Sequence, residues 1–313
     1  MDTSDQFFTK RTIVIVCALI CTGLWGSAIP CIKTGYALFQ VASGDSAAQL
    51  VFAGTRFFLA GLLTILFGSI LQSKEKGPCI LHPQSMSAVG KVIVLSCFQT
   101  IGQYIFFYIG VAHTTAVKGS ILTGCGSFIS ILLSCLFFKS DKLSFTKIVG
   151  CVLGFAGIVL VNLNGAAMDL SINLLGDGFM VISCLSSSIS ALIIKVYART
   201  EDAVMLSGWQ FAFGGAVMAV VGTLLGGRLS LVSAAGIPLI LYMALISSVA
   251  YTLWGILLKY NPVGVVASFG FLIPVFGVLI SALVLRDTAG ITIYCLIALC
   301  LVSAGIFLVN RAK

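Results

Sequence analysis

The stretch at residues 153–162 reads LGFAGIVLVN, and a closely similar stretch at residues 301–310 reads LVSAGIFLVN. Seven of the ten positions are identical, at an offset of 148 residues. A second pair lies earlier in the chain, where residues 54–57 (GTRF) resemble residues 208–211 (GWQF) at an offset of 154. Matches that keep the same order along both halves of the chain indicate an internal duplication.

The composition indicates that lipid is part of the solvent of this chain. Hydrophobic residues (AVILMFWYC) make up 59% of the 313 residues, and charged residues make up only 9%. Soluble globular domains carry about 25% charged residues, so this chain has too few to cover a surface that faces water. Its 33 glycines are typical of transmembrane helices, which use small residues to pack closely.

Ten apolar stretches are long enough to cross a membrane as helices. A run of about 20 mostly apolar residues is the signal of a transmembrane helix. The spans lie near residues 12–32, 47–71, 91–112, 117–138, 148–164, 175–197, 203–225, 236–258, 264–285 and 290–310.

The duplication divides these spans into two repeats of five, at residues 12–164 and 175–310. Because five is odd, the second repeat enters the membrane in the opposite sense to the first. We therefore predict an all-α integral membrane protein of ten transmembrane helices, arranged as two inverted five-helix repeats. Inverted repeats are typical of secondary transporters, whose substrate sites lie near the membrane midplane between the repeats.

The basic residues favour one orientation in the membrane. With the N-terminus in the cytoplasm, thirteen Lys and Arg residues fall on the inner side and five on the outer side. An excess of Lys and Arg in cytoplasmic loops is the rule for membrane proteins. We expect a multi-pass protein of the plasma membrane with both termini in the cytoplasm, which an even number of spans requires.

Several classes of function lack their sequence signatures. The longest stretch outside the spans, near residues 72–90, is too short to fold alone, and no GxxxxGK[ST] loop occurs. The cysteines form no CxxC pair or zinc spacing, and the basic residues form no patch for nucleic acid. We expect no catalytic residues, no metal, no cofactor and no nucleic acid. The expected partners are the lipid bilayer and a small-molecule metabolite, and the expected assembly is a monomer or a homodimer.

Arg56 is the clearest candidate for a binding residue. It lies about 14 Å into its span at 1.5 Å per residue, close to the midplane, where an ionisable side chain is costly. Its guanidinium presents a fixed fork of donors to a carboxylate or phosphate. The alternative is a structural arginine bonded to backbone carbonyls or helix ends. No Asp or Glu lies deep in any span, so the cargo is expected to be anionic or zwitterionic.

The other candidate substrate-binding residues are mainly aromatic rings and amides. Pockets for small molecules are mostly apolar, with a few placed polar groups. Tyr104 and Tyr251 occupy matching places in the two repeats, at an offset of 147. Lys118 opens the fourth span and either projects into the outer mouth of the cavity or snorkels to the interface. The remaining candidates, for which packing between helices is the alternative, are Trp25, Gln99, Gln103, Gln210 and Trp254.

Motifs in several spans follow one another in a defined order. They are Trp25-Gly26-Ser27 and Lys33 in span 1, Arg56-Phe57 in span 2, Pro274-Val275-Phe276 in span 9, and Leu153, Gly157-Ile158, Leu301 and Gly305-Ile306 in the last spans. With these motifs, residues 12–310 resemble the drug/metabolite transporter superfamily, in its ten-helix branch of duplicated EamA domains. The family often shows Gly-Glu after spans 4 and 9, whereas this chain has Lys139-Ser140-Asp141 and Arg286-Asp287, and Gly126 replaces the proline of span 4.

The resemblance implies export or exchange of small metabolites such as amino acids. We expect a secondary transporter that works by alternating access around a central cavity between the repeats. One alternative is a polyprenyl-lipid flippase on the same fold, which would open laterally between helices. A less favoured one is an integral membrane enzyme, which would need clustered carboxylates, histidines or metal ligands at the membrane edge.

Overall fold

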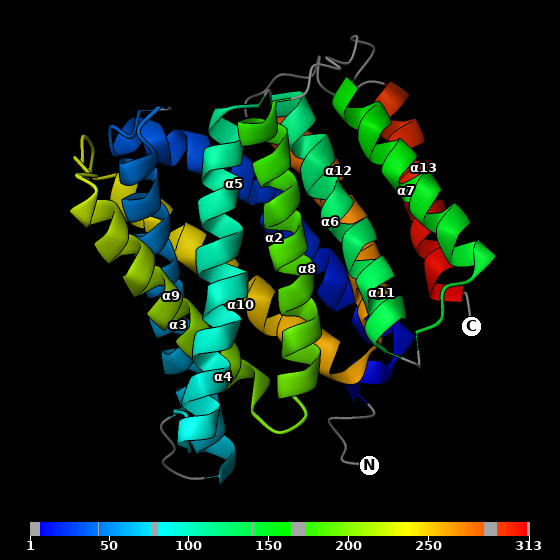
Figure 1. The fold of residues 1–313 in the computed structure, drawn as a ribbon, viewed down its shortest axis with the longest axis horizontal. Coiled ribbons are helices and arrows are strands. Elements are labelled where there is room, and N and C mark those ends of the chain that lie inside the picture. The colour runs from blue at the N-terminus through cyan, green and yellow to red at the C-terminus, as the bar shows by residue number, and fades with distance from the viewer. Residues whose placement is uncertain are drawn as a thin grey trace.

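A computed structural model describes residues 7–42, 44–76, 81–114, 116–138, 141–163, 173–284 and 293–311. Within these ranges the regular structure is entirely helical, and the helices pack into one bundle (Figure 1). The elements are α2 Arg11–Leu38, α3 Ser46–Lys76, α4 Met86–Ser96, η1 Cys97–Gly102, α5 Gln103–Ala112, α6 Ala116–Phe137, α7 Phe145–Leu163, η2 Leu174–Gly178, α8 Phe179–Tyr197, α9 Ala203–Leu224, α10 Gly236–Tyr260, α11 Val263–Ser268, η3 Phe269–Phe271, α12 Leu272–Val284 and α13 Ile293–Arg311.

The prediction of a polytopic helical membrane protein is confirmed. In the described part of the chain, nine helices are long and apolar enough to cross a membrane, and a shorter apolar helix covers Ile121–Phe137. Large apolar side chains such as Leu66, Leu136 and Val152 point outward and are exposed, whereas polar side chains such as Arg56 and Gln210 are buried. This distribution suits a surface that faces lipid.

Helix α2 runs through Pro30 as one helix, and three other spans contain a local departure from α-helical geometry. A π-helical segment, η1, joins α4 to α5, and a second one, η2, precedes α8. In the ninth span, the 3-10 turn η3 separates α11 from α12. Such departures are frequent at functional sites because they turn side chains away from their regular positions.

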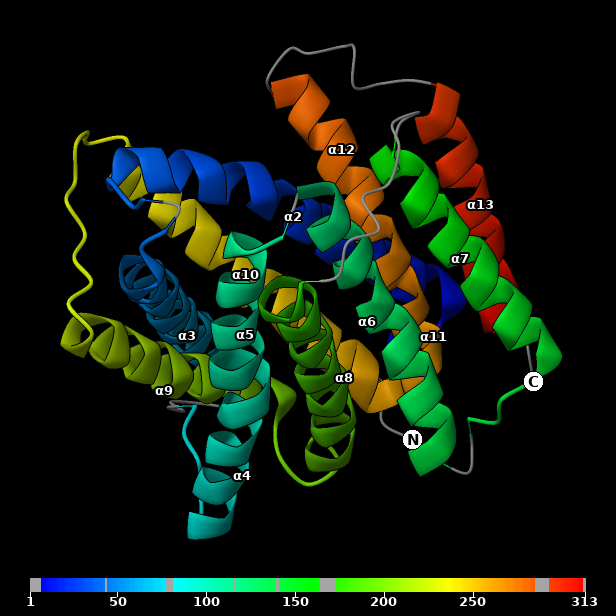
Figure 2. The same cartoon turned by 45° about the horizontal axis from the view of Figure 1, so that its top comes forward.

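Helices α3 and α9 cross at one side of the bundle with their backbones in contact (Figure 2). Glycines make this approach possible, because a Cβ on Gly215 would lie 2.8 Å from the carbonyl oxygen of Gly54. A Cβ on Gly54 would in turn lie 2.7 Å from the carbonyl oxygen of Gly215. Beside the crossing, the rings of Phe57 and Phe211 stack at 5.3 Å between centroids. Residues 54–57 and 208–211, which match in sequence, therefore both contribute to this crossing.

Helices α7 and α13 form a second close pair at one edge of the bundle (Figures 1 and 2). A Cβ on Gly150 would lie 2.8 Å from the carbonyl oxygen of Gly305, and one on Gly154 would meet the ring of Phe271 at 2.6 Å. The GxxxG spacing of Gly150 and Gly154 is thus used within the chain, for packing against α13 and η3.

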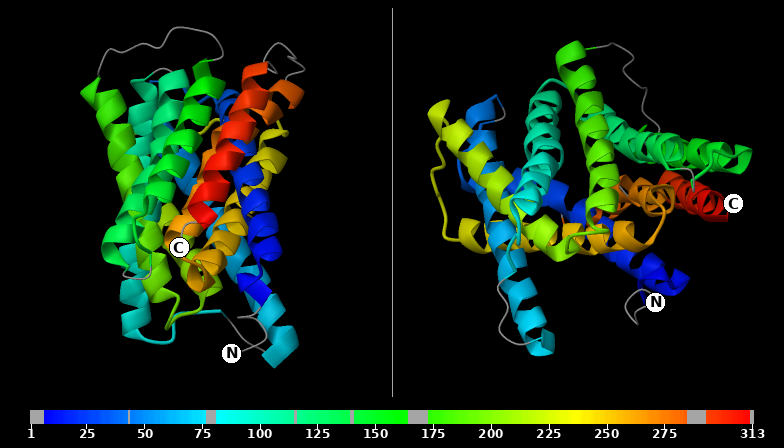
Figure 3. Two further views of the ribbon diagram at one scale, coloured as in Figure 1. Left: turned by 90° about the vertical axis from the view of Figure 1, so that its right-hand side faces the viewer. Right: turned by 60° about the horizontal axis from the view of Figure 1, so that its bottom comes forward.

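The first residue of α2 and the last residue of α13 lie at the same end of the bundle (Figure 3). Helix α2 starts, and α13 stops, toward the lower end in Figure 3 (left). This arrangement is what an even number of membrane crossings produces.

Candidate functional site

A cavity of about 240 Å³ lies inside the bundle. Its lining comes from spans in both halves of the chain, and it includes seven of the nine residues predicted to bind substrate: Trp25, Arg56, Gln99, Gln103, Tyr104, Tyr251 and Trp254. Pockets for drug-sized ligands measure roughly 300–1,000 Å³, so this cavity suits a smaller molecule.

Arg56 is the cation of this cavity. It follows the first residue of α3 by ten positions, or about 15 Å at 1.5 Å per residue, and only 2% of the residue is exposed. Its Nε and Nη2 donate hydrogen bonds to the hydroxyl of Ser247 at 3.3 and 2.9 Å. The guanidinium carbon also lies 4.8 Å from the ring centroid of Phe57.

No carboxylate neutralises Arg56 within the described residues, where the three ion pairs all involve lysines. A hydroxyl and an aromatic ring leave the full positive charge in place. Burying an unpaired charge is costly, so the site favours an anion that binds next to the guanidinium.

Aromatic rings form one wall of the cavity. The hydroxyls of Tyr104 and Tyr251 share a hydrogen bond at 2.6 Å, which joins α5 to α10. The indole of Trp25 meets the rings of Tyr251 and Trp254 edge to face, each at 5.0 Å between centroids. Edge-to-face packing holds aromatic rings in defined orientations, so this wall is rigid and mostly apolar.

Three buried polar atoms on the lining have no hydrogen-bond partner in the described structure: Trp25 Nε1, Gln99 Oε1 and Gln103 Oε1. Buried polar groups normally find partners. An orphaned group on a cavity wall is therefore available for a ligand. Gln99 lies in the π-helical segment η1 and Gln103 directly follows it.

Hydroxyl side chains form another wall. They come from two stripes, Thr123, Ser127 and Ser130 on α6 and Ser183, Ser187 and Ser190 on α8. In both stripes the steps are four and then three residues, the spacing of one helix face. This spacing is visible in the sequence and predicts that each stripe lies on one face of its helix, a signal that the sequence analysis did not use.

The remaining two predicted residues lie outside this lining. Lys118 forms an ion pair with Asp177 at 2.8 Å, near the start of its span. Gln210 is fully buried between helices, where its Oε1 accepts a hydrogen bond from the hydroxyl of Thr100 at 2.5 Å. Lys118 and the Oε1 of Gln210 therefore have partners within the protein, whereas the buried Nε2 of Gln210 has none among the described residues.

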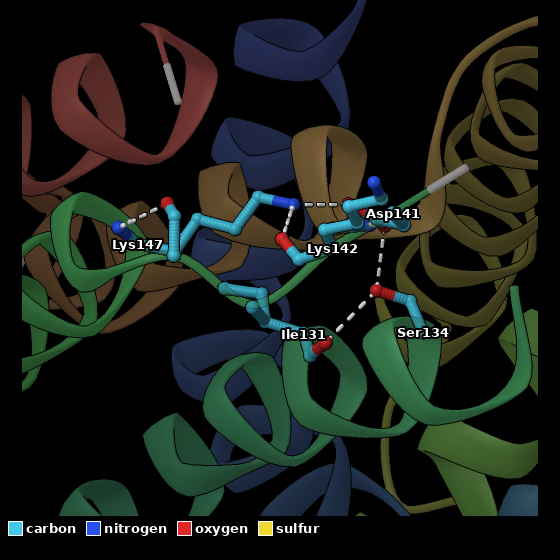
Figure 4. A network of polar contacts seen from close by, with 7 residues as sticks. Ile131, Ser134, Asp141, Lys142 and Lys147 are labelled. Carbon is cyan, nitrogen blue, oxygen red and sulfur yellow. Dashed lines mark hydrogen bonds and ion pairs between the residues drawn. The ribbon is translucent and has the colours of Figure 1, made fainter. Parts of the chain in front are cut away.

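A polar network closes the end of the bundle at which α6 stops (Figure 4). Asp141 pairs with Lys147, and its Oδ2 accepts hydrogen bonds from the hydroxyl of Ser134 at 2.7 Å and from the amide of Gly264 at 3.0 Å. Burial raises the pKa of Asp141, but the hydrogen bonds and the charge of Lys147 outweigh it and bring the pKa below its ordinary value of 3.8. Asp141 thereby ties the first half of the chain to the start of α11. The sequence analysis also named residues that stand where the family often shows Gly-Glu. Of these, Lys139, Ser140, Arg286 and Asp287 lie outside the described residues.

Comparison with known proteins identifies the class of this chain. In the described part of the chain, a bundle of apolar, membrane-length helices defines a multi-pass membrane protein. The model of the EamA-like transporter family matches residues 12–163 and 174–311. The chain belongs to the EamA-like transporter family, within the drug/metabolite transporter superfamily, as its motifs had suggested.

The relatives agree with this assignment. The uncharacterized transporter YvbV of Bacillus subtilis is 24% identical over 97% of this chain and 93% of its own length. A chloroplastic WAT1-related protein of Arabidopsis thaliana is 23% identical over 75% of this chain, and the match spans 57% of that relative. A solved crystal structure with a TM-score of 0.76 and 14% identity covers 96% of both chains and supports the fold.

Proposed function

We propose that this chain is a secondary transporter, an exporter or exchanger, of small anionic or zwitterionic metabolites such as amino acids. The observation that carries the proposal is the buried guanidinium of Arg56, which faces the central cavity without a carboxylate among the described residues. A cargo carboxylate would accept hydrogen bonds from the guanidinium and neutralise its charge. The aromatic wall would enclose the body of the cargo.

Alternating access would result from rocking of two inverted five-helix repeats around this cavity. Related contacts on the two sides of the α3 and α9 crossing support that arrangement. Arg56 of α3 bonds to Ser247 of α10, and Gln210 of α9 bonds to Thr100 of η1. Arg56 and Gln210 match at an offset of 154, and Thr100 and Ser247 match at 147. Each repeat would thus bond to the other through equivalent positions.

Counterflow in proteoliposomes tests the transport proposal. Liposomes preloaded with pooled amino acids, carboxylates, nucleosides or organic cations are offered the labelled pool outside, for wild type and for Arg56→Gln. We expect exchange of anionic or zwitterionic metabolites by wild type and at least a roughly tenfold loss in the variant, since a charged hydrogen bond contributes about 1.5–3 kcal/mol.

Arg228→Gln is the matched control, because Arg228 is exposed in the segment that joins α9 to α10. This control should exchange as wild type does, and all proteins should elute as folded species in size-exclusion chromatography. Exchange of cations alone would contradict the proposal, and so would unchanged exchange by Arg56→Gln. Movement of polyprenyl lipid without any metabolite would favour the flippase alternative.

We further propose that the protein resides in the plasma membrane with both termini in the cytoplasm. The excess of Lys and Arg on one side of the spans supports this orientation. Single cysteines at Asp45 and Glu201, each introduced into a background without the eleven native cysteines, test it. A membrane-impermeant maleimide should label position 45, but not position 201, in intact cells. The reverse pattern would contradict the orientation.

A further inference from the structure

The hydroxyl wall of the cavity contains two hydroxyls that form no hydrogen bond with the other residues that the structure describes. Four of its six hydroxyls donate hydrogen bonds within the chain: Thr123 to the carbonyl of Gly119 (2.8 Å), Ser130 to Ser188 Oγ (2.9 Å), Ser183 to the carbonyl of Gln103 (2.8 Å) and Ser190 to the carbonyl of Ser187 (2.7 Å). The hydroxyls of Ser127 and Ser187 have no partner among the described residues.

Gln99 provides a second, independent indication that this part of the cavity takes a ligand. Gln99 is 5% exposed, lines the same cavity, and its Oε1 lacks a partner in the described structure. It is presented by the π-helical segment η1, which runs beside α8. A buried amide without a partner destabilises the protein until a ligand completes its hydrogen bonds.

The backbone opposite Ser127 leaves room for its hydroxyl. Gly270 lies in the 3-10 turn η3, and a Cβ at this position would clash with Ser127 Oγ. The hydroxyl of Ser127 packs directly against this glycine, and any larger residue at position 270 would displace it. The segments η1 and η3, which depart from α-helical geometry, both contribute lining residues to the cavity, and they pack against α8 and α6, the two helices that carry the serines.

This part of the cavity is chemically different from the surroundings of Arg56. Arg56 comes from α3, whereas Ser127 and Ser187 come from α6 and α8, and α3 and α6 stand on different sides of the bundle (Figures 1 and 2). The described lining near the serines contributes hydroxyl and amide groups without a charge. Such groups both donate and accept hydrogen bonds, and they suit a neutral polar group rather than a second ion.

We infer that Ser127, Ser187 and Gln99 form a second recognition subsite, which binds a hydroxyl or a primary amide at the far end of the cargo. The inference rests on the proposed function, in which Arg56 binds the anionic end. The preferred cargo is therefore a short bifunctional metabolite, with a carboxylate at one end and a hydroxyl or amide at the other. A carboxylate with a purely apolar far end leaves the second subsite unsatisfied.

Two matched pairs of probes test this subsite in proteoliposomes: 4-hydroxybutanoate against butanoate, and glutamine against norvaline. The readout is the ratio of uptake between the polar and the apolar member of each pair. Wild type should favour the polar member by roughly three- to tenfold, the value of one hydrogen bond. The double variant Ser127→Ala/Ser187→Ala should bring the ratio close to one, and Gly270→Ala should lower it through displacement of Ser127.

Ser190→Ala is the control, because its hydroxyl lies on the same helix face and lines the same cavity but already bonds to a backbone carbonyl. It should keep the wild-type ratio. A wild-type ratio of one overturns the second subsite, as does a ratio that the double variant leaves unchanged. The second subsite is also overturned if the protein transports other anions but none of the four probe compounds. In each of these three outcomes the proposed function still stands if Arg56→Gln abolishes anion exchange. If anion exchange does not depend on Arg56, the proposed function itself is overturned.

Discussion

The hydroxyl of Ser247 accepts two hydrogen bonds from Arg56, from Nε at 3.3 Å and from Nη2 at 2.9 Å. Ser247 belongs to α10 and Arg56 to α3, so one neutral oxygen fixes the orientation of the buried cation across two helices. The contact holds the guanidinium in place but leaves its charge available. Substitutions at Ser247 can therefore test the role of the charge of Arg56 separately from the role of its orientation.

We expect Ser247→Asp to block anion exchange without unfolding the protein. A carboxylate at this position would pair with Arg56 and occupy the place of the cargo anion, because buried opposite charges attract strongly. Exchange should fall at least roughly tenfold, while the melting temperature in detergent should hold or rise. Ser247→Asn is the control, because asparagine is similar in size to aspartate but neutral. This variant should retain more exchange activity than Ser247→Asp. Equal exchange by both variants would argue against an anion site at Arg56.

Gln210 should matter for stability and not for substrate choice. It is fully buried, lies outside the lining of the cavity, and accepts a hydrogen bond from Thr100. We expect Gln210→Ala to destabilise the protein by about 1–3 kcal/mol, because the hydroxyl of Thr100 loses its buried partner. Thermal unfolding followed by circular dichroism measures this loss. A changed ranking of substrates in counterflow would show that Gln210 contacts the cargo after all.

The crossing of α3 and α9 should not tolerate a single added methyl group. A Cβ on Gly215 would lie 2.8 Å from the carbonyl oxygen of Gly54, and only backbone movement relieves such a clash. We therefore expect Gly215→Ala to lower both folded yield and melting temperature. Gly90→Ala is the control, since no atom lies within 4 Å of its added Cβ and alanine favours a helix. Normal folding of Gly215→Ala would contradict the close crossing.

The ion pair of Asp141 and Lys147 should make stability fall at acid pH. The pKa of Asp141 in the folded protein lies below its ordinary value of 3.8. The carboxylate of Asp141 therefore makes its full contribution to folding stability above the unfolded pKa, which is about 3.9. The contribution is lost as the pH falls from there through the folded pKa. Asp141→Asn should lower the melting temperature at pH 7, since breaking a buried pair costs about 3–5 kcal/mol. The difference from wild type should shrink toward pH 3.

The double variant Asp141→Asn/Lys147→Met distinguishes this ion pair from other acid effects. It removes the buried cation that Asp141→Asn leaves without a carboxylate, so we expect it to recover part of the lost stability. Melting curves at pH 7 and pH 3 provide the comparison. If the double variant is no more stable than Asp141→Asn at pH 7, the unpaired charge of Lys147 is not the cause of the destabilisation.

The sequence predicted the helical spans well and the cavity in part. Long apolar stretches are a strong signal, and every predicted span corresponds to a helical segment. Arg56 was identifiable because a deep charge is rare. Gln210 matches Arg56 in the duplication, but its shorter amide bonds to Thr100 and lies outside the cavity lining. Sequence does not fix the rotation of each helix about its own axis, and this rotation decides which side chains reach the cavity.

Lys118 shows a second limit of the sequence. Its position at the start of a span suited either the cavity mouth or the membrane interface, and neither alternative included a partner. The structure pairs it with Asp177, which lies 59 residues away in the chain. Ser127 and Ser187 show the opposite case, because their helical spacing is legible in the sequence. The sequence does not show which hydroxyls bond within the protein. The structure shows these bonds, and it leaves Ser127 and Ser187 without a partner among the described residues.

The charge of Arg56, which no carboxylate among the described residues neutralises, also has an electrical consequence. Moving one elementary charge through 100 mV changes the free energy by about 2.3 kcal/mol. An empty cavity carries the positive charge of Arg56, whereas a monovalent anion bound there makes it neutral. Membrane voltage would then act on the return of the empty carrier and not on the loaded step. With a zwitterion both steps would carry the same charge, so the voltage dependence of each half-cycle distinguishes the two kinds of cargo.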